Sequence, residues 1–301
     1  MKKTIALTLT LALVLSLTAC GKGTDGGSNS SADTQSENIT ATENPEAEIS
    51  DTEDGAGESD GAAANEEPAA EVSDSEGSTD GKSEGVMTYA EYDAAALDSE
   101  VVIETYVQAK QSWWEDKATL YTQDKDGAYF VYNAVCSEAD YDKLTPGTKI
   151  KVTGYKTEWS GEVEVAEGAT IEILDGNYTA PATDVTDLLS KEDELIKHQN
   201  KFVSFKGMTV ETYEKDGESY DCAVVYNDDN SGSAADNNDL YFNVSKDGQT
   251  YTFCVESYLC DSSTDVYKAV ENLQVGDTVD LEGFLYWYNG ANPHITSVTV
   301  K

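Results

Sequence analysis

Apolar and polar residues alternate with a period of two through much of the chain after Met87. The segments 149–153 and 278–282, for example, carry an apolar residue at every second position. This period is typical of β-strands that bury one face. In a first stretch of chain it predicts strands over residues 101–109, 118–124, 128–135, 149–159 and 162–173. In a second stretch it predicts strands over 201–211, either 220–225 or 240–244, 249–259, 278–287 and 293–300.

Four short segments carry helix signals instead. A serine cap predicts a helix over 137–140, and a second helix is predicted over 264–273. Thr88 and Glu91 form a capping box that predicts an amphipathic helix near the start of the ordered part. Residues 184–198 also have helical character. We interpret these last two segments as packing elements outside the sheets.

The predicted elements form two copies of one unit. Residues 144–161 align with 273–290 at a constant offset of 129, which pairs Gly147 with Gly276 and Trp159 with Tyr288. Upstream matches have an offset of 124, so the second copy holds five additional residues. Each copy therefore follows the order β-β-β-α-β-β, and the chain contains two homologous domains.

The segments 145–154 and 275–283 each contain one glycine just before a predicted strand and a second glycine within that strand. Together with a helix between strands three and four, they resemble the OB-fold, a five-stranded Greek-key barrel. The resemblance implies a mainly β protein with two tandem OB-like barrels, one over 87–182 and one over 183–301. A β-sandwich is the alternative fold.

The first twenty residues have the build of a secretion signal. Two lysines precede an uncharged, mostly apolar run over 5–17, and Leu17-Thr18-Ala19-Cys20 follows. The run is too short for a permanent transmembrane helix. The tetrad resembles the lipobox of bacterial lipoproteins, which implies cleavage before Cys20 and its lipidation. We therefore expect an extracytoplasmic protein that a lipid on Cys20 anchors to the membrane; an ordinary cleaved signal is the alternative.

Residues 21–86 lack the composition of a folded domain. They hold 18 acidic residues and two lysines, and almost no apolar residue larger than alanine. None of the 28 aromatic residues precedes Met87. Such a segment cannot bury enough apolar surface to fold alone, so we interpret it as a disordered acidic linker that spaces the barrels from the membrane.

Charge argues against a phosphate-binding role. The whole chain has a net charge of −39, and every one of its 19 basic residues is lysine. Both predicted barrels are strongly acidic and lack the bidentate guanidinium that grips phosphates and guanine. Single-stranded nucleic acid, a ligand often associated with OB-folds, is kept as an alternative on the resemblance alone.

Aromatic residues gather in the loops that bind ligands in OB-folds. The loop joining strands one and two of the first copy contains Trp113 and Trp114, and the loop joining strands four and five contains Trp159. The second copy offers Tyr213 and the run Tyr286, Trp287 and Tyr288. Aromatic faces beside polar groups suit a glycan, a cell-wall component or a protein partner. Closure of the barrel ends, in a purely structural envelope lipoprotein, is the alternative.

Three further features are candidates for a chemical role: an acidic loop, a cysteine pair and the two histidines. The loop containing Asp228, Asp229, Asp236 and Asp239 is a calcium candidate, although its spacing is not that of an EF-hand. An exported protein permits disulfides, and Cys222 with Cys254 is one possible pair if their strands are neighbours. Neither histidine has a recognisable catalytic companion. We therefore expect no cofactor and a protein that binds its ligand without converting it; a carboxylate-based hydrolase is the remaining enzyme alternative.

Overall fold

The computed structural model describes residues 82–301. The predicted signal peptide, the lipidation site Cys20 and all but the last five residues of the predicted linker lie outside the described residues. Within residues 82–301, no helix has the length and apolar character needed to span a bilayer.

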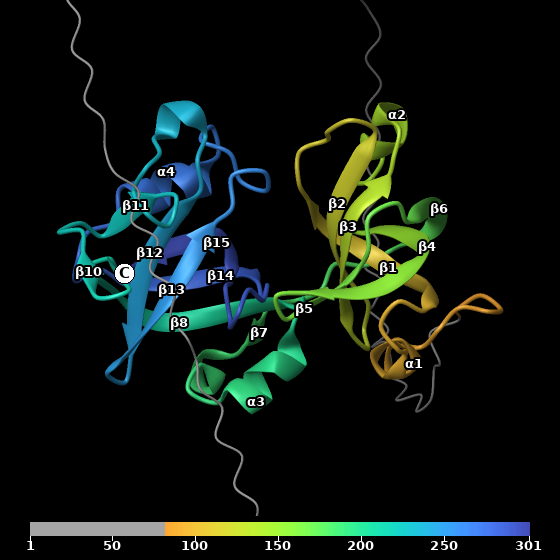
Figure 1. The fold of residues 1–301 in the computed structure, drawn as a ribbon, viewed down its shortest axis with the longest axis horizontal. Helices are drawn as coiled ribbons and strands as arrows, with labels where there is room; N and C mark the ends of the chain where they lie inside the picture. Colours follow the sequence, from red (N-terminus) through yellow and green to blue (C-terminus); the bar gives the residue numbers. More distant parts are fainter. Residues whose placement is uncertain (1–81) are drawn as a thin grey trace, which may run out of the picture. The chain divides into compact units, whose positions relative to one another are not determined.

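The first barrel is a closed sheet with the OB strand order (Figure 1). Its strands are β1 (Glu100–Lys110), β2 (Lys117–Gln123), β3 (Ala128–Val135), β4 (Thr148–Trp159), β5 (Glu162–Val165) and β6 (Thr170–Asn177). β1 pairs with both β2 and β4, and β3 closes the barrel by pairing in parallel with β5. β5 and β6 both pair with β4, so they act as one interrupted fifth strand. The predicted five-stranded barrel is confirmed.

The second barrel repeats this order. Its strands are β8 (Phe202–Glu211), β12 (Leu240–Lys246), β13 (Gln249–Val255), β14 (Thr278–Phe284) and β15 (His294–Val300). β8 pairs with β12 and β14, and a parallel bridge between β13 and β15 closes the barrel. The structure resolves the open choice for the second strand in favour of β12. β11 (Val224–Tyr226) pairs on the outer edge of β12. The short strand β7 (Thr183–Asp184) pairs with β8. β9 (Glu214–Lys215) and β10 (Glu218–Ser219) pair with each other as a separate two-stranded sheet.

The helices occupy the predicted segments. α2 (Glu138–Tyr141) and α4 (Asp265–Glu271) lie between the third and fourth barrel strands. α1 (Tyr89–Ala94) begins after Thr88, and both hydrogen bonds of the predicted capping box are present. The segment between the barrels forms η1 (Thr186–Leu188), α3 (Glu192–Leu195) and η2 (Ile196–His198).

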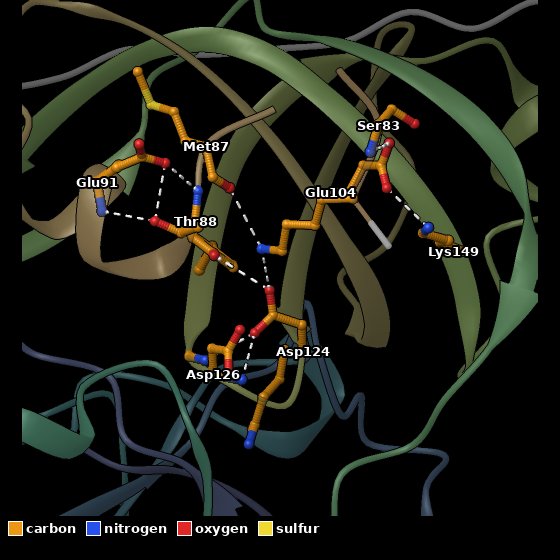
Figure 2. A network of polar contacts seen from close by, with 12 residues as sticks. Ser83, Met87, Thr88, Glu91, Glu104, Asp124, Asp126 and Lys149 are labelled. Atoms are coloured by element: carbon orange, nitrogen blue, oxygen red, sulfur yellow. Dashed lines mark hydrogen bonds and ion pairs between the residues drawn. The ribbon is translucent and has the colours of Figure 1, made fainter. Parts of the chain in front are cut away.

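The chain before α1 is attached to the first barrel by polar contacts (Figure 2). Lys82 forms an ion pair with the buried Asp124 at 2.8 Å. The backbone N–H of Ser83 donates to Glu104, whose other carboxylate oxygen lies 2.8 Å from Lys149. The last residues of the predicted linker are therefore part of the folded unit.

Each barrel has its own apolar core, and a third cluster joins them. Inward residues of β1 to β5 form one core, and inward residues of β8 to β15 form the other. The third cluster consists of outward residues: Tyr121 and Phe130 from the first barrel meet Phe284 from the second. Tyr121 stacks on Phe284 with ring centroids 4.6 Å apart. The second barrel thus covers part of the β2–β3 face of the first, the face on which OB-folds usually bind ligands.

Candidate binding groove between the two barrels

A groove of about 1080 Å³ lies where the two barrels meet. We call it the inter-barrel groove. Its size is in the range of pockets that bind small molecules and short oligomers. Its walls are formed by the residues Gln111, Ser112, Trp114, Lys117, Thr119, Phe130, Tyr132, Asn133, Thr157, Glu158, Trp159 and Glu164 of the first barrel, and Asn227, Asp228, Asp239, Tyr241, Cys254, Glu256, Tyr258, Tyr286, Tyr288, Asn292 and His294 of the second.

Corresponding parts of the two barrels form the two walls. The first barrel contributes its second and third strands and the β1–β2 loop, together with the end of β4 and part of β5. The second contributes β12 and β13, the insertion before β12 and the loop β14–β15. These are the elements that form the ligand face of an OB-fold, so the groove lies between the uncovered parts of two such faces.

Exposed aromatic side chains are concentrated in this groove. Within residues 82–301, six tyrosine or tryptophan side chains are exposed to solvent, and five of them line it: Trp114, Tyr132, Trp159, Tyr258 and Tyr288. The sixth, Tyr155, lies elsewhere. Contiguous exposed apolar surface is uncommon on soluble domains and marks interaction sites. The groove is therefore the best candidate binding site on the described surface.

Two equivalent residues of the repeat contact each other at one end of the groove. Trp159 and Tyr288 occupy matching positions, and their ring centroids are 5.0 Å apart at an angle of 32°. The backbone N–H of Asn289 donates to the carbonyl of Ser160 at 2.7 Å beside them. Both rings remain about half exposed, with 54% and 48% of their surface accessible, so their outer faces are free to stack on a ligand.

Four of the seven predicted aromatic site residues line the groove: Trp114, Trp159, Tyr286 and Tyr288. The structure separates the adjacent tryptophans of the β1–β2 loop. Trp114 is 68% exposed, whereas Trp113 is half-buried and donates its Nε1–H to the carbonyl of Cys136 at 3.0 Å. Trp113 therefore holds the loop against its own barrel instead of lining the groove.

Two residues of the predicted aromatic rim, Tyr213 and Trp287, are buried and do not line the groove. Tyr213 is almost fully buried, and its hydroxyl donates to the carbonyl of Asp228. Trp287 packs in the core of the second barrel, and Gly161 of the first barrel lies directly against its ring. In the run Tyr286, Trp287 and Tyr288, the middle ring is therefore buried, and the outer two line the groove.

Buried polar groups in the groove were missed by the sequence-based prediction. Glu256 accepts hydrogen bonds from the Gln111 amide at 3.1 Å and from the backbone N–H of Leu259 at 2.9 Å. Burial, together with the nearby Asp239 carboxylate, raises the pKa of Glu256 to about 7. His294 shares a 2.6 Å hydrogen bond with the Tyr121 hydroxyl. Burial lowers the pKa of His294 to about 3, so this ring is neutral at pH 7.

The acidic residues of β5 face the second barrel. Glu162 and Glu164 alternate with Val163 and Val165, whose side chains pack toward the first barrel's core. Glu162 is fully buried and accepts from the backbone N–H of Trp287 at 2.9 Å. Glu164 lines the groove. The alternation in sequence does indicate that both acids point outward, but their burial depends on the other barrel and has no local signal.

The groove has a negative electrostatic character. Five acidic side chains line it, namely Glu158, Glu164, Asp228, Asp239 and Glu256, against the single lysine Lys117. Lys117 forms an ion pair with Glu167, which does not line the groove, at 2.6 Å. Such a surface attracts cations and repels phosphates.

The predicted disulfide is not formed. Cys222 and Cys254 are free thiols. β12 pairs with β11 on one side and with β13 on the other, so it separates the strands next to Cys222 and containing Cys254. Two strand spacings amount to roughly 10 Å, beyond the ~7 Å Cα separation that a disulfide can span.

The four aspartates of the calcium candidate do not converge. Asp228 pairs with Lys215, Asp229 accepts from the backbone N–H of Ser231, and Asp236 accepts from Ser233. Asp239 accepts from both the backbone and the hydroxyl of Ser257. In the described part of the chain, no three His, Cys, Asp or Glu side chains are grouped as metal ligands. Each of the four carboxylates instead holds a local turn or loop contact.

Comparisons with known proteins gave structural matches only. No family model matches the chain, and no curated protein does. A murine DNA-binding protein solved with double-stranded DNA is 12% identical, covers 66% of this chain and 94% of its own, and gives a TM-score of 0.32. The Ifi202 HINa domain in complex with 20-bp double-stranded DNA is 12% identical, covers 67% of this chain and 98% of its own, and gives a TM-score of 0.30. The tetrameric p202 HIN2 is 11% identical, covers 68% of this chain and 95% of its own, and gives a TM-score of 0.29. The OB assignment comes from the strand order above.

Proposed function

We propose that the protein binds a glycan or glycan-containing cell-wall component in the inter-barrel groove and does not convert it chemically. The concentration of five exposed aromatic side chains in one groove carries this proposal. Sugar rings have flat apolar faces that stack on tyrosine and tryptophan, and hydroxyls that need directional polar partners. Asn133, Asn227 and Asn292 line the groove beside the rings and can supply such partners.

The proposal includes the location of the protein. The signal sequence and the lipobox that ends at Cys20 support export and attachment to the outer face of a membrane. The acidic linker would then hold the groove away from the lipid surface, within reach of wall polymers. Replacing Cys20 with serine is expected to release the protein from the membrane fraction; continued membrane retention of this variant would contradict lipid anchoring.

Double-stranded DNA is bound by two of the structural neighbours, and single-stranded nucleic acid is the alternative that the fold resemblance suggests. Charge disfavours both for this chain. The groove carries five carboxylates and one lysine, and the chain contains no arginine. Nucleic-acid grooves instead place cations along the phosphate backbone.

The test removes stacking surface while preserving the fold. Alanine at Trp114, Trp159 and Tyr288 together is expected to weaken binding of soluble wall glycan fragments at least about tenfold, because each lost ring removes part of the contact. Tyr155→Ala is the matched control, because it removes an exposed aromatic ring outside the groove. Titration calorimetry with wall fragments and with oligonucleotides measures both classes.

Three outcomes are distinct. Loss of glycan binding in the triple variant but not in Tyr155→Ala supports the groove. Equal binding by the triple variant and the unmodified protein would exclude these rings as the site. Tight oligonucleotide binding without glycan binding would replace the proposed ligand class.

A further inference from the structure

Glu164 is a largely buried residue whose carboxylate opens into the inter-barrel groove and has no protein partner in the described part of the chain. Its side chain lines the inter-barrel groove and only 7% of the residue surface is accessible. Among residues 82–301, no hydrogen-bond donor and no lysine pairs with this carboxylate. Its neighbour on the same face, Glu162, is fully buried: one of its carboxylate oxygens accepts from Trp287 and Gln199, and the other has no partner among residues 82–301. The Glu164 carboxylate faces the groove without a protein partner from the described residues, so a ligand bound in the groove can supply one.

The surroundings of Glu164 combine aromatic rings with further negative charge. Its backbone lies beside Phe130 in the parallel β3–β5 ladder, and its charge acts on the hydroxyl of Tyr286. Burial raises the pKa of Glu164 to about 7, because the ionised carboxylate loses hydration and gains no partner in exchange. An incoming cation would recover that loss and would also interact with the faces of the neighbouring rings.

We propose that the ligand carries an ammonium group that pairs with Glu164, and that the groove selects glycans with a free amino group over their N-acetylated forms. This inference rests on the proposed glycan-binding function. An acetamido group is neutral and cannot replace the missing charge partner. An anionic group would face the carboxylates of Glu164 and Glu256 in the same groove. The free amine thus satisfies the unpaired carboxylate, and the sugar ring occupies the aromatic surface.

The test uses two β-1,4-linked glucosamine trimers that differ in one group. One trimer is fully N-acetylated, and the other has a single free amine, which limits non-specific attraction to the acidic chain. Calorimetric titration of the full chain at pH 7 is expected to show at least about tenfold tighter binding of the amine trimer, in line with a charge-assisted hydrogen bond. Glu164→Gln is expected to reduce this ratio to near one.

Matched variants separate the role of Glu164 from total charge. Glu172→Gln removes one negative charge from an exposed position on β6 and should leave the ratio unchanged. Glu164→Leu removes the same carboxylate in a different shape and should behave like Glu164→Gln, which guards against an artefact of one substitution. Thermal unfolding followed by circular dichroism checks that each variant is folded.

The outcomes distinguish this inference from the function it rests on. Equal affinity for the two trimers, or a preference that survives in both Glu164 variants, overturns the ammonium inference while leaving glycan binding intact. Failure of both trimers to bind overturns both. A lysine peptide that binds more tightly than either trimer would assign the carboxylate to a protein ligand and overturn the glycan assignment.

Discussion

The two barrels share their strand order but differ on the strand that follows the turn after the fourth barrel strand. The first barrel carries Glu162 and Glu164 there, both buried against the second barrel. The aligned segments end at Gly161 and Gly290; in the parallel ladder that closes each barrel, the second barrel has His294 where the first has Glu164. The repeated residues close each barrel, whereas the residues that differ create an acidic wall on one side of the groove. The asymmetry of the groove therefore arises from the parts of the repeat that do not repeat.

The matching turns show the same difference. Trp159 and Tyr288 are equivalent, similarly exposed and in contact with each other. Gly161 and Gly290 are also equivalent and both have positive φ, +91° and +139°. A Cβ added to Gly161 would lie 2.8 Å from the Trp287 ring, but one added to Gly290 would have no neighbour within 4 Å. Both turns contact the other barrel, but only the glycine of the first turn lies directly against a buried ring.

The largest expected effect comes from comparing two tryptophans beside these turns. Trp287→Ala removes a ring from the core of the second barrel and should lower the free energy of unfolding by about 3–5 kcal/mol. Trp159→Ala removes a half-exposed ring and should cost about 1 kcal/mol or less. Denaturant unfolding of both variants measures the difference. Similar losses in the two would contradict the assignment of Trp287 to the core and Trp159 to the groove surface.

The paired glycines test the contact between the barrels. Gly161→Ala and Gly290→Ala both place a side chain at positive φ, so both should lose some stability from backbone strain. Gly161→Ala should lose a further ~1–3 kcal/mol, because its methyl group overlaps the buried Trp287 ring. Chemical denaturation at two wavelengths would also show whether the barrels then unfold separately. Equal destabilisation would mean that the first turn is not packed as described.

Most of the fold was predictable because it depends on local patterns. Alternation in strands such as Thr148–Trp159 identifies the inward residues, and Thr88 with Glu91 specifies the start of α1 through a capping box. The choice for the second strand of the second barrel was left open, since both candidate segments alternate. Only pairing with β8 and β13 distinguishes Leu240–Lys246.

The site was predictable only in part because it depends on what covers each barrel. Loop position identified Trp114, Trp159 and Tyr288, whose exposure follows from the ends of the strands. Loop position could not distinguish Trp287 from its neighbours, because the burial of Trp287 comes from tertiary packing. Glu164 was missed for the same reason: a glutamate that points away from its own barrel normally faces water, and here it faces the second barrel.

The smallest expected effect is a pH dependence of stability that comes from the acidic wall. Folding raises the pKa of Glu164 and of Glu256 to about 7, from about 4.3 in an unfolded chain. The folded state therefore binds more protons between these values, and stability falls as the pH rises through this window. His294 acts in the opposite direction, since its folded pKa of about 3 lies below its unfolded value of about 6.5. Its contribution is present above pH 6.5 and is lost as the pH falls.

Over the interval from pH 8 to pH 6.5, comparing Glu164→Gln with the unmodified protein isolates Glu164, because the contribution of His294 is the same in both proteins. Across it, Glu164→Gln should remove about 1 kcal/mol of the pH dependence, since glutamine does not titrate. Glu172→Gln, exposed on β6, should leave the dependence unchanged. Denaturant unfolding of the three proteins at both pH values provides the measurement. If the Glu164→Gln protein showed the full pH dependence, the carboxylate would already be paired or hydrated in the folded state, and the acidic wall would not be poised to accept a cation.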